Sequence, residues 1–194
     1  MGISLSKGQN ISLTKSAPGL TNARVGLGWD ARATSGAGFD LDAQALLLDA
    51  SGKVLDGGNG SFIFYNQLSN ANGSVVHQGD NLTGDGDGDD EQIHLELNNI
   101  PADVDKVVFS VSIHDADARQ QTFGQVRNAY VRLVNEDNEE EIVRYDLSED
   151  ASTDTAVNFA EVYRHNGEWK FKAIGQGYST GLAGLATDFG VQLG

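Results

Sequence analysis

The chain has 194 residues, and its 39% hydrophobic content is enough for a packed core, so we expect one domain spanning residues 1–194. Its 28 acidic and 13 basic side chains give a formal net charge of −15, which argues against nucleic acid and anionic membranes as partners and favours cations. Cysteine is absent, which excludes disulfides, thiolate metal sites and redox chemistry by thiols.

The N-terminal segment MGISLSKGQNISLTKSAPG places polar residues at every second or third position. It has neither the continuous apolar stretch of a signal peptide nor the length of apolar sequence that a spanning helix needs. We therefore expect a soluble protein that stays in the cytoplasm and is not inserted directly into a membrane.

Short runs with an apolar residue at every second position predict strands through most of the chain. They include VGLGWD (25–30), FDLDAQALLL (39–48), FIFY (62–65) and IHLEL (93–97). The run KVVFSVSIH (106–114) is almost entirely apolar, which is typical of a central strand buried on both faces.

Two hairpins are predicted in the second half of the chain, over 130–147 and 157–175. Asn166 and Gly167 supply a pair suited to positive φ at the second turn. Helical periodicity is scarce, with short segments near 119–128 and at the C-terminus, and the glycine-rich 175–184 is predicted as a surface loop. About ten short strands with few helices favour an all-β fold, an antiparallel two-sheet β-sandwich, over a parallel α/β fold.

The stretch GDNLTGDGDGDDE (79–91) alternates carboxylates with glycine, as at Asp85, Asp87 and Asp89. Glycine allows the backbone to curl, so that several oxygens can point at one hard cation. Calcium suits this pattern better than magnesium because it accepts six to eight oxygens in a flexible geometry. A solvated acidic loop without an ion is the alternative from composition alone.

Known calcium loops do not match this stretch. Asp90 stands where an EF-hand requires glycine, and the residues from Ile93 onward alternate as a strand where a helix should continue. A calcium-binding β-roll needs stacked repeats, whereas this pattern occurs once. Zinc is disfavoured because the four histidines are scattered along the chain and thiolates are absent.

Further aspartates lie at predicted strand ends. Asp40 and Asp42 stand two apart in one strand, so both carboxylates project from one face while Phe39 and Leu41 face the core. Asp30 follows Trp29 at the end of another strand. If these ends are neighbours, the carboxylates could form one cation cage or two adjacent ones.

Seven motifs together resemble the TerD family of bacterial tellurium-resistance and stress proteins, and the resemblance covers nearly the whole chain. The motifs are VGLGWDAR (25–32), FDLDAQALLLD (39–49), FIFYNQL (62–68), GDNLTGDGDGDDE (79–91), IHDADARQQTFGQVRNAYVRLVN (113–135), RYDLSEDASTDTA (144–156) and EVYRHNGEWKFKAIGQG (161–177).

The resemblance implies a cytoplasmic β-sandwich that binds one or two calcium ions and acts with other proteins of a tellurite-resistance system. Family members often carry a basic residue where Leu82 stands and Glu where Asp85 stands, and the carboxylate at position 85 is retained here. The metal ligands implied for this chain are Asp30, Asp40, Asp42, Asp80, Asn81, Asp85, Asp87, Asp89, Asp90 and Glu91.

The leading interpretation is a non-enzymatic calcium-binding sensor or scaffold for stress response and tellurite resistance. A metal-dependent hydrolase or phosphotransfer enzyme that uses the same carboxylates is one alternative. A calcium-bridged binder of sugars or lipid headgroups is another. No nucleophile motif is recognisable in the sequence, and many equivalent oxygens are typical of ion coordination.

Overall fold

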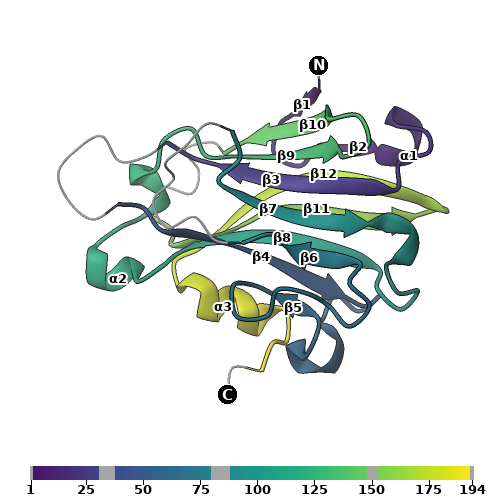
Figure 1. Cartoon of the computed structure of the whole chain (residues 1–194). Coiled ribbons are helices and arrows are strands. Elements are labelled where there is room, and N and C mark those ends of the chain that lie inside the picture. Colours follow the sequence, from purple (N-terminus) through teal and green to yellow (C-terminus); the bar gives the residue numbers. More distant parts are fainter. Residues whose placement is uncertain (1, 31–37, 80–87, 148–152, 193–194) are drawn as a thin grey trace.

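The structure is a computed structural model that describes residues 2–30, 38–79, 88–147 and 153–192 (Figure 1). It contains two sheets of six strands each, and the side chains between them form the main core. The prediction of an all-β two-sheet sandwich is therefore confirmed. No helix within the described ranges is long and apolar enough to span a membrane.

The sheet nearer the viewer in Figure 1, called sheet A, has the strand order β1, β10, β9, β3, β7, β6. Its strands are β1 Ile3–Leu5, β10 Glu140–Asp146, β9 Tyr130–Asn135, β3 Asn22–Gly28, β7 Glu91–Glu96 and β6 Val75–His77. All the neighbouring pairs are antiparallel except β1 and β10, which run parallel. The predicted hairpin over 130–147 is formed by β9 and β10.

The second sheet, called sheet B, has the order β2, β12, β11, β8, β4, β5, and its neighbouring pairs are antiparallel. Its strands are β2 Asn10–Ser12, β12 Glu168–Tyr178, β11 Ala156–His165, β8 Lys106–Ile113, β4 Leu41–Leu48 and β5 Phe62–Ile63. The predicted turn between β11 and β12 has φ of 51° at Asn166 and 76° at Gly167. Strand β8 lies between β11 and β4, as its nearly continuous apolar sequence predicted.

The core follows from the period-two alternation of the strands. Val25 of β3 and Ile93 of β7 are fully buried on the inner face of sheet A, and Phe109 of β8 is fully buried on the inner face of sheet B. Successive side chains on a strand point to opposite faces, so the residues between these positions lie on the outer faces. The two outer faces differ strongly.

Among the residues that the structure describes, helical structure is limited to short pieces. They are α1 Leu13–Ser16, α2 Ala116–Arg119, α3 Gly181–Asp188, η1 Leu55–Gly58, η2 Leu97–Asn99 and η3 Phe123–Gln125. The segment 119–128, predicted to be helical, contains only the last residue of α2 and the single turn η3. Helix α3 packs on the outer face of sheet B, where Leu185 and Ala186 are fully buried beside Leu46 and Val108.

Two local predictions were wrong. The glycine-rich segment 175–184 is not a surface loop, because β12 continues to Tyr178 and α3 starts at Gly181. The strand predicted over 62–65 stops at Ile63, since Phe64 and Gln67 exchange backbone hydrogen bonds that close a turn. In the first segment the pairing of β12 with β11 overrode the local composition, and in the second a local turn ended the strand.

Candidate functional site

The ends of several strands meet at one end of the sandwich. The register pairs Leu27 with Glu91 and Leu41 with Ile113, so β3 and β8 end where β7 and β4 begin. A hydrogen bond between the sheets joins these ends, because the Ala43 backbone N–H in β4 donates to the Glu91 carboxylate in β7 at 2.5 Å. We call this region the acidic end, defined by the described side chains Asp30, Asp40, Asp42, Asp89, Asp90 and Glu91.

The acidic end contains six of the ten ligands implied by the family resemblance. The other four, Asp80, Asn81, Asp85 and Asp87, lie outside the described residues. Within the described ranges, no group of three or more His, Asp or Glu side chains is placed so that it could hold a metal ion.

Glu91 points into the interior between the sheets and contacts His77. Its carboxylate lies 3.4 Å from Nε2 of His77, and both side chains are 1% exposed. The His77 Nδ1 atom accepts a hydrogen bond from the Gly79 backbone N–H at 3.1 Å, which leaves the ring proton on Nε2, facing the carboxylate. This buried pair links residues on either side of the 80–87 segment.

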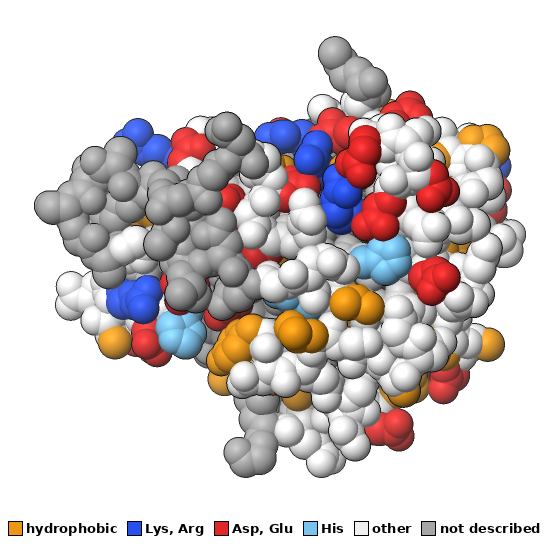
Figure 2. All heavy atoms as spheres, in the orientation of Figure 1, with side chains coloured by type: hydrophobic (Ala, Val, Ile, Leu, Met, Phe, Trp, Pro, Cys, Tyr) orange, Lys and Arg blue, Asp and Glu red, His pale blue; other side chains and the backbone are white. Residues whose placement is uncertain are grey.

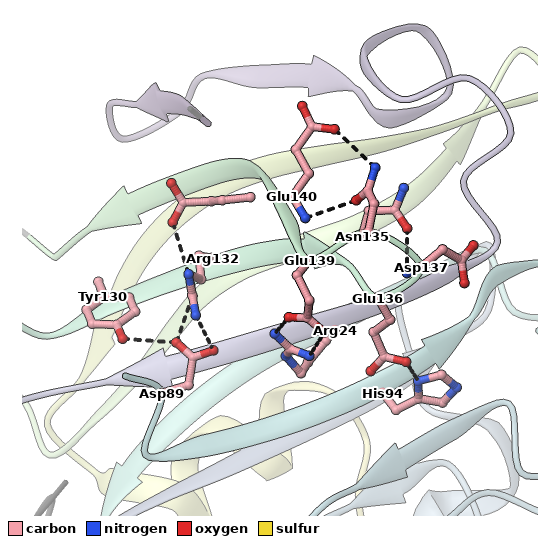
Figure 3. Close-up of polar contacts among 12 residues, drawn as sticks. Arg24, Asp89, His94, Tyr130, Arg132, Asn135, Glu136, Asp137, Glu139 and Glu140 are labelled. Carbon is pink, nitrogen blue, oxygen red and sulfur yellow. Dashed lines mark hydrogen bonds and ion pairs between the residues drawn. The ribbon is translucent and has the colours of Figure 1, made fainter. Parts of the chain in front are cut away.

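Asp89 lies on the outer face of sheet A and is held by two side chains of β9 (Figure 3). Arg132 donates from Nε to Oδ1 at 2.8 Å and from Nη2 to Oδ2 at 3.0 Å, and the Tyr130 hydroxyl donates to Oδ1 at 2.9 Å. The Asp89 side chain is 0% exposed. We call Asp89, Tyr130 and Arg132 the Asp89 clamp.

The clamp changes the acidity of its members. Burial raises the pKa of the Tyr130 phenol, and the neighbouring Asp89 charge raises it further. The hydrogen bond to Asp89 raises the pKa of the Arg132 guanidinium above its ordinary value. The clamp is therefore an ion pair with a protonated phenol beside it.

Asp90 and Asp30 hold the end of β3. The Asp90 backbone N–H donates to the Leu27 carbonyl at 2.7 Å, and its carboxylate accepts from the Trp29 N–H at 2.9 Å. Asp30 is exposed and accepts from the Asn128 side chain at 2.6 Å. These contacts fix the chain direction immediately after β3 and immediately before β7.

Asp40 and Asp42 lie at the start of β4 and are only 7% and 4% exposed. Phe39 and Leu41 point into the core, as the alternation predicted. Asp42 lies 3.6 Å from Nδ1 of His114, whose side chain is 41% exposed. Asp115 contacts the same histidine at 3.4 Å.

The outer face of sheet A carries acidic and basic side chains interspersed over β10, β9 and β3 (Figure 2). Arg24 of β3 makes two hydrogen bonds to Glu139, at 3.2 and 2.7 Å, and His94 of β7 lies 2.8 Å from Glu136. Arg132 also pairs across the strands with Glu141 of β10, at 3.7 Å.

Sequence reasoning missed the residues that hold the predicted ligands, above all Tyr130, Arg132 and His77. One signal could have indicated the clamp. Gly26 and Gly28 stand two apart on β3 and therefore share its outer face. Glycines at such positions indicate that another group approaches the backbone closely, and here Asp89 covers Gly26 while the Tyr130 ring covers Gly28.

Comparison with known proteins places these features in a family. The TerD domain model matches residues 1–189. The chain is 59% identical over 191 residues to tellurium resistance protein TerD of Serratia marcescens, covering 98% of both chains. It is 58% identical over 195 residues to general stress protein 16U of Bacillus subtilis (strain 168), covering 100% of both.

A solved structure supports the fold. It is described as a homologue of telluride resistance protein (TerD) from Streptomyces coelicolor A3(2). The TM-score is 0.72 at 24% identity, and the match covers 89% of this chain and 98% of the other. At this identity the similarity shows the shared fold alone.

Proposed function

The chain belongs to the TerD family of tellurium-resistance and stress-response proteins, and on this premise we propose that it binds calcium at the acidic end. We further propose that it acts as a non-enzymatic sensor or scaffold in the cytoplasm, together with other proteins of the same resistance system. The observation that carries the proposal is the concentration of buried carboxylates at one end of the sandwich.

Asp40, Asp42 and Glu91 are each less than 8% exposed and come from strands whose ends meet. Burying carboxylates is costly unless positive charge or hydrogen bonds compensate. His77 faces Glu91, and His114 faces Asp42. A divalent cation that accepts oxygen ligands would lower the remaining repulsion.

The residue types fit calcium. Carboxylate and amide oxygens are its preferred ligands, and it tolerates an irregular cage. Asp30, Asp40 and Asp42 would contribute from the described strand ends, and Asp80, Asn81, Asp85 and Asp87 would contribute from the acidic segment. The bound ion would supply two positive charges to this end.

The sensor role follows from how the acidic end is connected to the rest of the molecule. The Glu91 carboxylate joins β7 to β4, and Asp90 joins the start of β7 to the end of β3. A change in charge at the acidic segment would therefore act on both sheets at once. A partner protein would recognise the resulting change in the surface.

Thermal unfolding with calcium and with a chelator tests calcium binding. At a hundredfold excess over the dissociation constant, binding to the folded state adds about 2.7 kcal/mol, which corresponds to a rise of roughly 5–10 °C in Tm for a chain of this size. We expect Asp42→Asn to lose most of this rise. The matched control is Asp103→Asn, an exposed aspartate before β8 with the same change of charge. An identical Tm with calcium and chelator would contradict the proposal.

The non-enzymatic role is supported by the names of the relatives, which describe resistance and stress proteins. The alternative, a metal-dependent hydrolase or phosphotransfer enzyme, makes a different prediction. It requires turnover of a phosphate or ester substrate with magnesium or manganese, abolished in Asp42→Asn. Such turnover would replace the sensor proposal, whereas calcium-dependent capture of a partner without turnover would support it.

A further inference from the structure

The Asp89 carboxylate already accepts hydrogen bonds from two side chains of β9. Oδ1 accepts two hydrogen bonds, from Tyr130 and from Arg132 Nε, and Oδ2 accepts one from Arg132 Nη2. The side chain has no exposed area, and a guanidinium lies against it. A calcium ion that used this carboxylate would have to displace Arg132 and then remain near its positive charge.

The location of Asp89 also separates it from the aspartates of β4. Asp89 lies on the outer face of sheet A, whereas Asp42 projects from the outer face of sheet B, away from the shared core. Packed sheets lie about 10 Å apart, and calcium holds its oxygens at about 2.3–2.6 Å. One ion cannot contact both carboxylates across the sandwich.

The glycines of β3 show that the fold leaves space for the Asp89 side chain on the outer face of this strand. A Cβ atom at Gly26 would lie 2.1 Å from Asp89 Oδ2, and a Cβ atom at Gly28 would lie 2.4 Å from the Tyr130 ring. Both are far inside van der Waals contact. The outer face of β3 therefore leaves room for the carboxylate and for the ring that donates to it.

The clamp acts at one end of the acidic segment. Asp89 comes two residues after the undescribed stretch 80–87, and Asp90 next to it is bonded to the Leu27 carbonyl and the Trp29 N–H. We infer that Asp89 is a positioning residue: it fixes the C-terminal end of the acidic segment on sheet A and does not ligate the ion. The inference rests on the proposed calcium binding for its effect on affinity, and on the clamp alone for its effect on the backbone.

Arg132→Gln separates the two roles because they predict changes of opposite direction. If Asp89 is a ligand, removing the guanidinium frees its carboxylate, and calcium binds as well as before or more tightly. If Asp89 is a positioning residue, removing the guanidinium releases the end of the segment. We then expect weaker binding by about 10–100-fold, the usual cost of losing a group that orients a metal site.

The experiment is calcium titration by calorimetry on the wild type, Arg132→Gln, Asp89→Asn and the double variant. Positioning predicts that the two single variants and the double variant lose similar affinity, because all three break the same interaction. Arg132→Lys, which keeps the charge without the two-pronged contact, should lie between Arg132→Gln and the wild type. Unchanged or tighter binding in Arg132→Gln, together with weaker binding in Asp89→Asn, would overturn the inference.

Arg24→Gln is the matched control, since Arg24 lies on the same face of the adjacent strand β3 and pairs with Glu139 instead. It loses the same charge near the acidic end and leaves the clamp in place. We expect its calcium affinity to be equal to that of the wild type or slightly higher. A loss as large as that of Arg132→Gln would show that charge alone is responsible and would contradict positioning.

Amide hydrogen exchange without calcium tests the clamp independently of the proposed function. We expect faster exchange at the Asp90 N–H in Arg132→Gln and Asp89→Asn than in Arg24→Gln, because the bond to Leu27 would open more often. Wild-type protein that binds no calcium, together with this difference, would refute the calcium proposal and leave the anchoring role supported. Equal exchange in all variants would refute the anchoring role even if calcium binds.

Discussion

The two outer faces of the sandwich are stabilised in different ways. Sheet B is covered by α3, and Leu46 and Val108 are buried there beneath Leu185. Sheet A instead carries ion pairs and hydrogen bonds between strands, among them Arg24 with Glu139 and Arg132 with Asp89. Burial of apolar area stabilises a fold more per residue, whereas exposed ion pairs contribute little and partly buried ones mainly fix geometry.

The same difference separates two aspartates that look equivalent in sequence. Asp42, on the sheet B side, lies beside Gln44, which bonds to Ser110 and Ser112 in a buried polar row and contacts the Asp42 carbonyl. Asp89, on the sheet A side, is paired with a guanidinium and a phenol. Asp42 lies 3.6 Å from the partly exposed His114 side chain, whereas Asp89 is held by a guanidinium, so we expect a cation to displace the partner of Asp42 more easily.

The largest effect is expected from removing apolar burial on the sheet B side. Leu185 is fully buried under α3, and Leu185→Ala should lower the free energy of unfolding by about 2–5 kcal/mol, since such truncations lose transfer energy and leave a cavity. Urea denaturation measures the change. Thr187→Ala, on the exposed side of the same helix, should change stability by less than about 0.5 kcal/mol. Equal effects for the two variants would mean that α3 does not stabilise this face by burial.

A smaller loss of stability is expected when the space that holds the Asp89 side chain on sheet A is filled. Gly26→Ala places a methyl group where the carboxylate lies, so we expect a loss of about 1–3 kcal/mol, typical of overpacking. Gly38→Ala is the control, because a Cβ atom there meets no other heavy atom within 4 Å. Denaturation midpoints of the two variants give the answer. If Gly26→Ala were as stable as Gly38→Ala, the Asp89 side chain could move aside without loss of stability, and the clamp would not be rigid.

The alternation of apolar residues was sufficient to predict most of the fold. Runs such as 39–48 and 106–114 identified the central strands of sheet B, and the Asn166 and Gly167 pair identified a hairpin. The parallel pairing of β1 with β10 was not predictable, because three-residue edge strands take their partner from tertiary contacts. The α3 helix was expected at the C-terminus, yet its role as a cover for sheet B follows only from the packing.

The sequence was sufficient to predict which residues belong to the candidate site. It was not sufficient to predict what each of them contacts. Spacing predicted that Asp40 and Asp42 share a face, and Phe39 and Leu41 lie in the core as that alternation requires. Spacing could not show that Arg132, more than forty positions after Asp89, would neutralise that carboxylate. Charge pairing across strands depends on register, which a single sequence specifies only indirectly.

The smallest expected effect concerns the phenol of the clamp and shows as a dependence on pH. Burial and the Asp89 charge raise the pKa of Tyr130 in the folded protein, so the phenol keeps its proton above pH 10 when folded and loses it when unfolded. Unfolding then releases a proton, and this contribution to stability is complete below the unfolded pKa and is lost as the pH rises.

The Tyr130→Phe variant lacks the hydroxyl group that carries this proton. At pH 8 we expect the variant to be less stable than the wild type by about 1 kcal/mol, the usual contribution of one hydrogen bond. The difference should shrink as the pH rises from 8 to 11, because only the wild type is then penalised by the phenol. Urea midpoints at each pH measure the trend, with Tyr65→Phe as an exposed control outside the clamp. A difference that stays constant with pH would show that Asp89 does not depend on the Tyr130 proton, and Arg132 would then be the only group of the clamp that holds it.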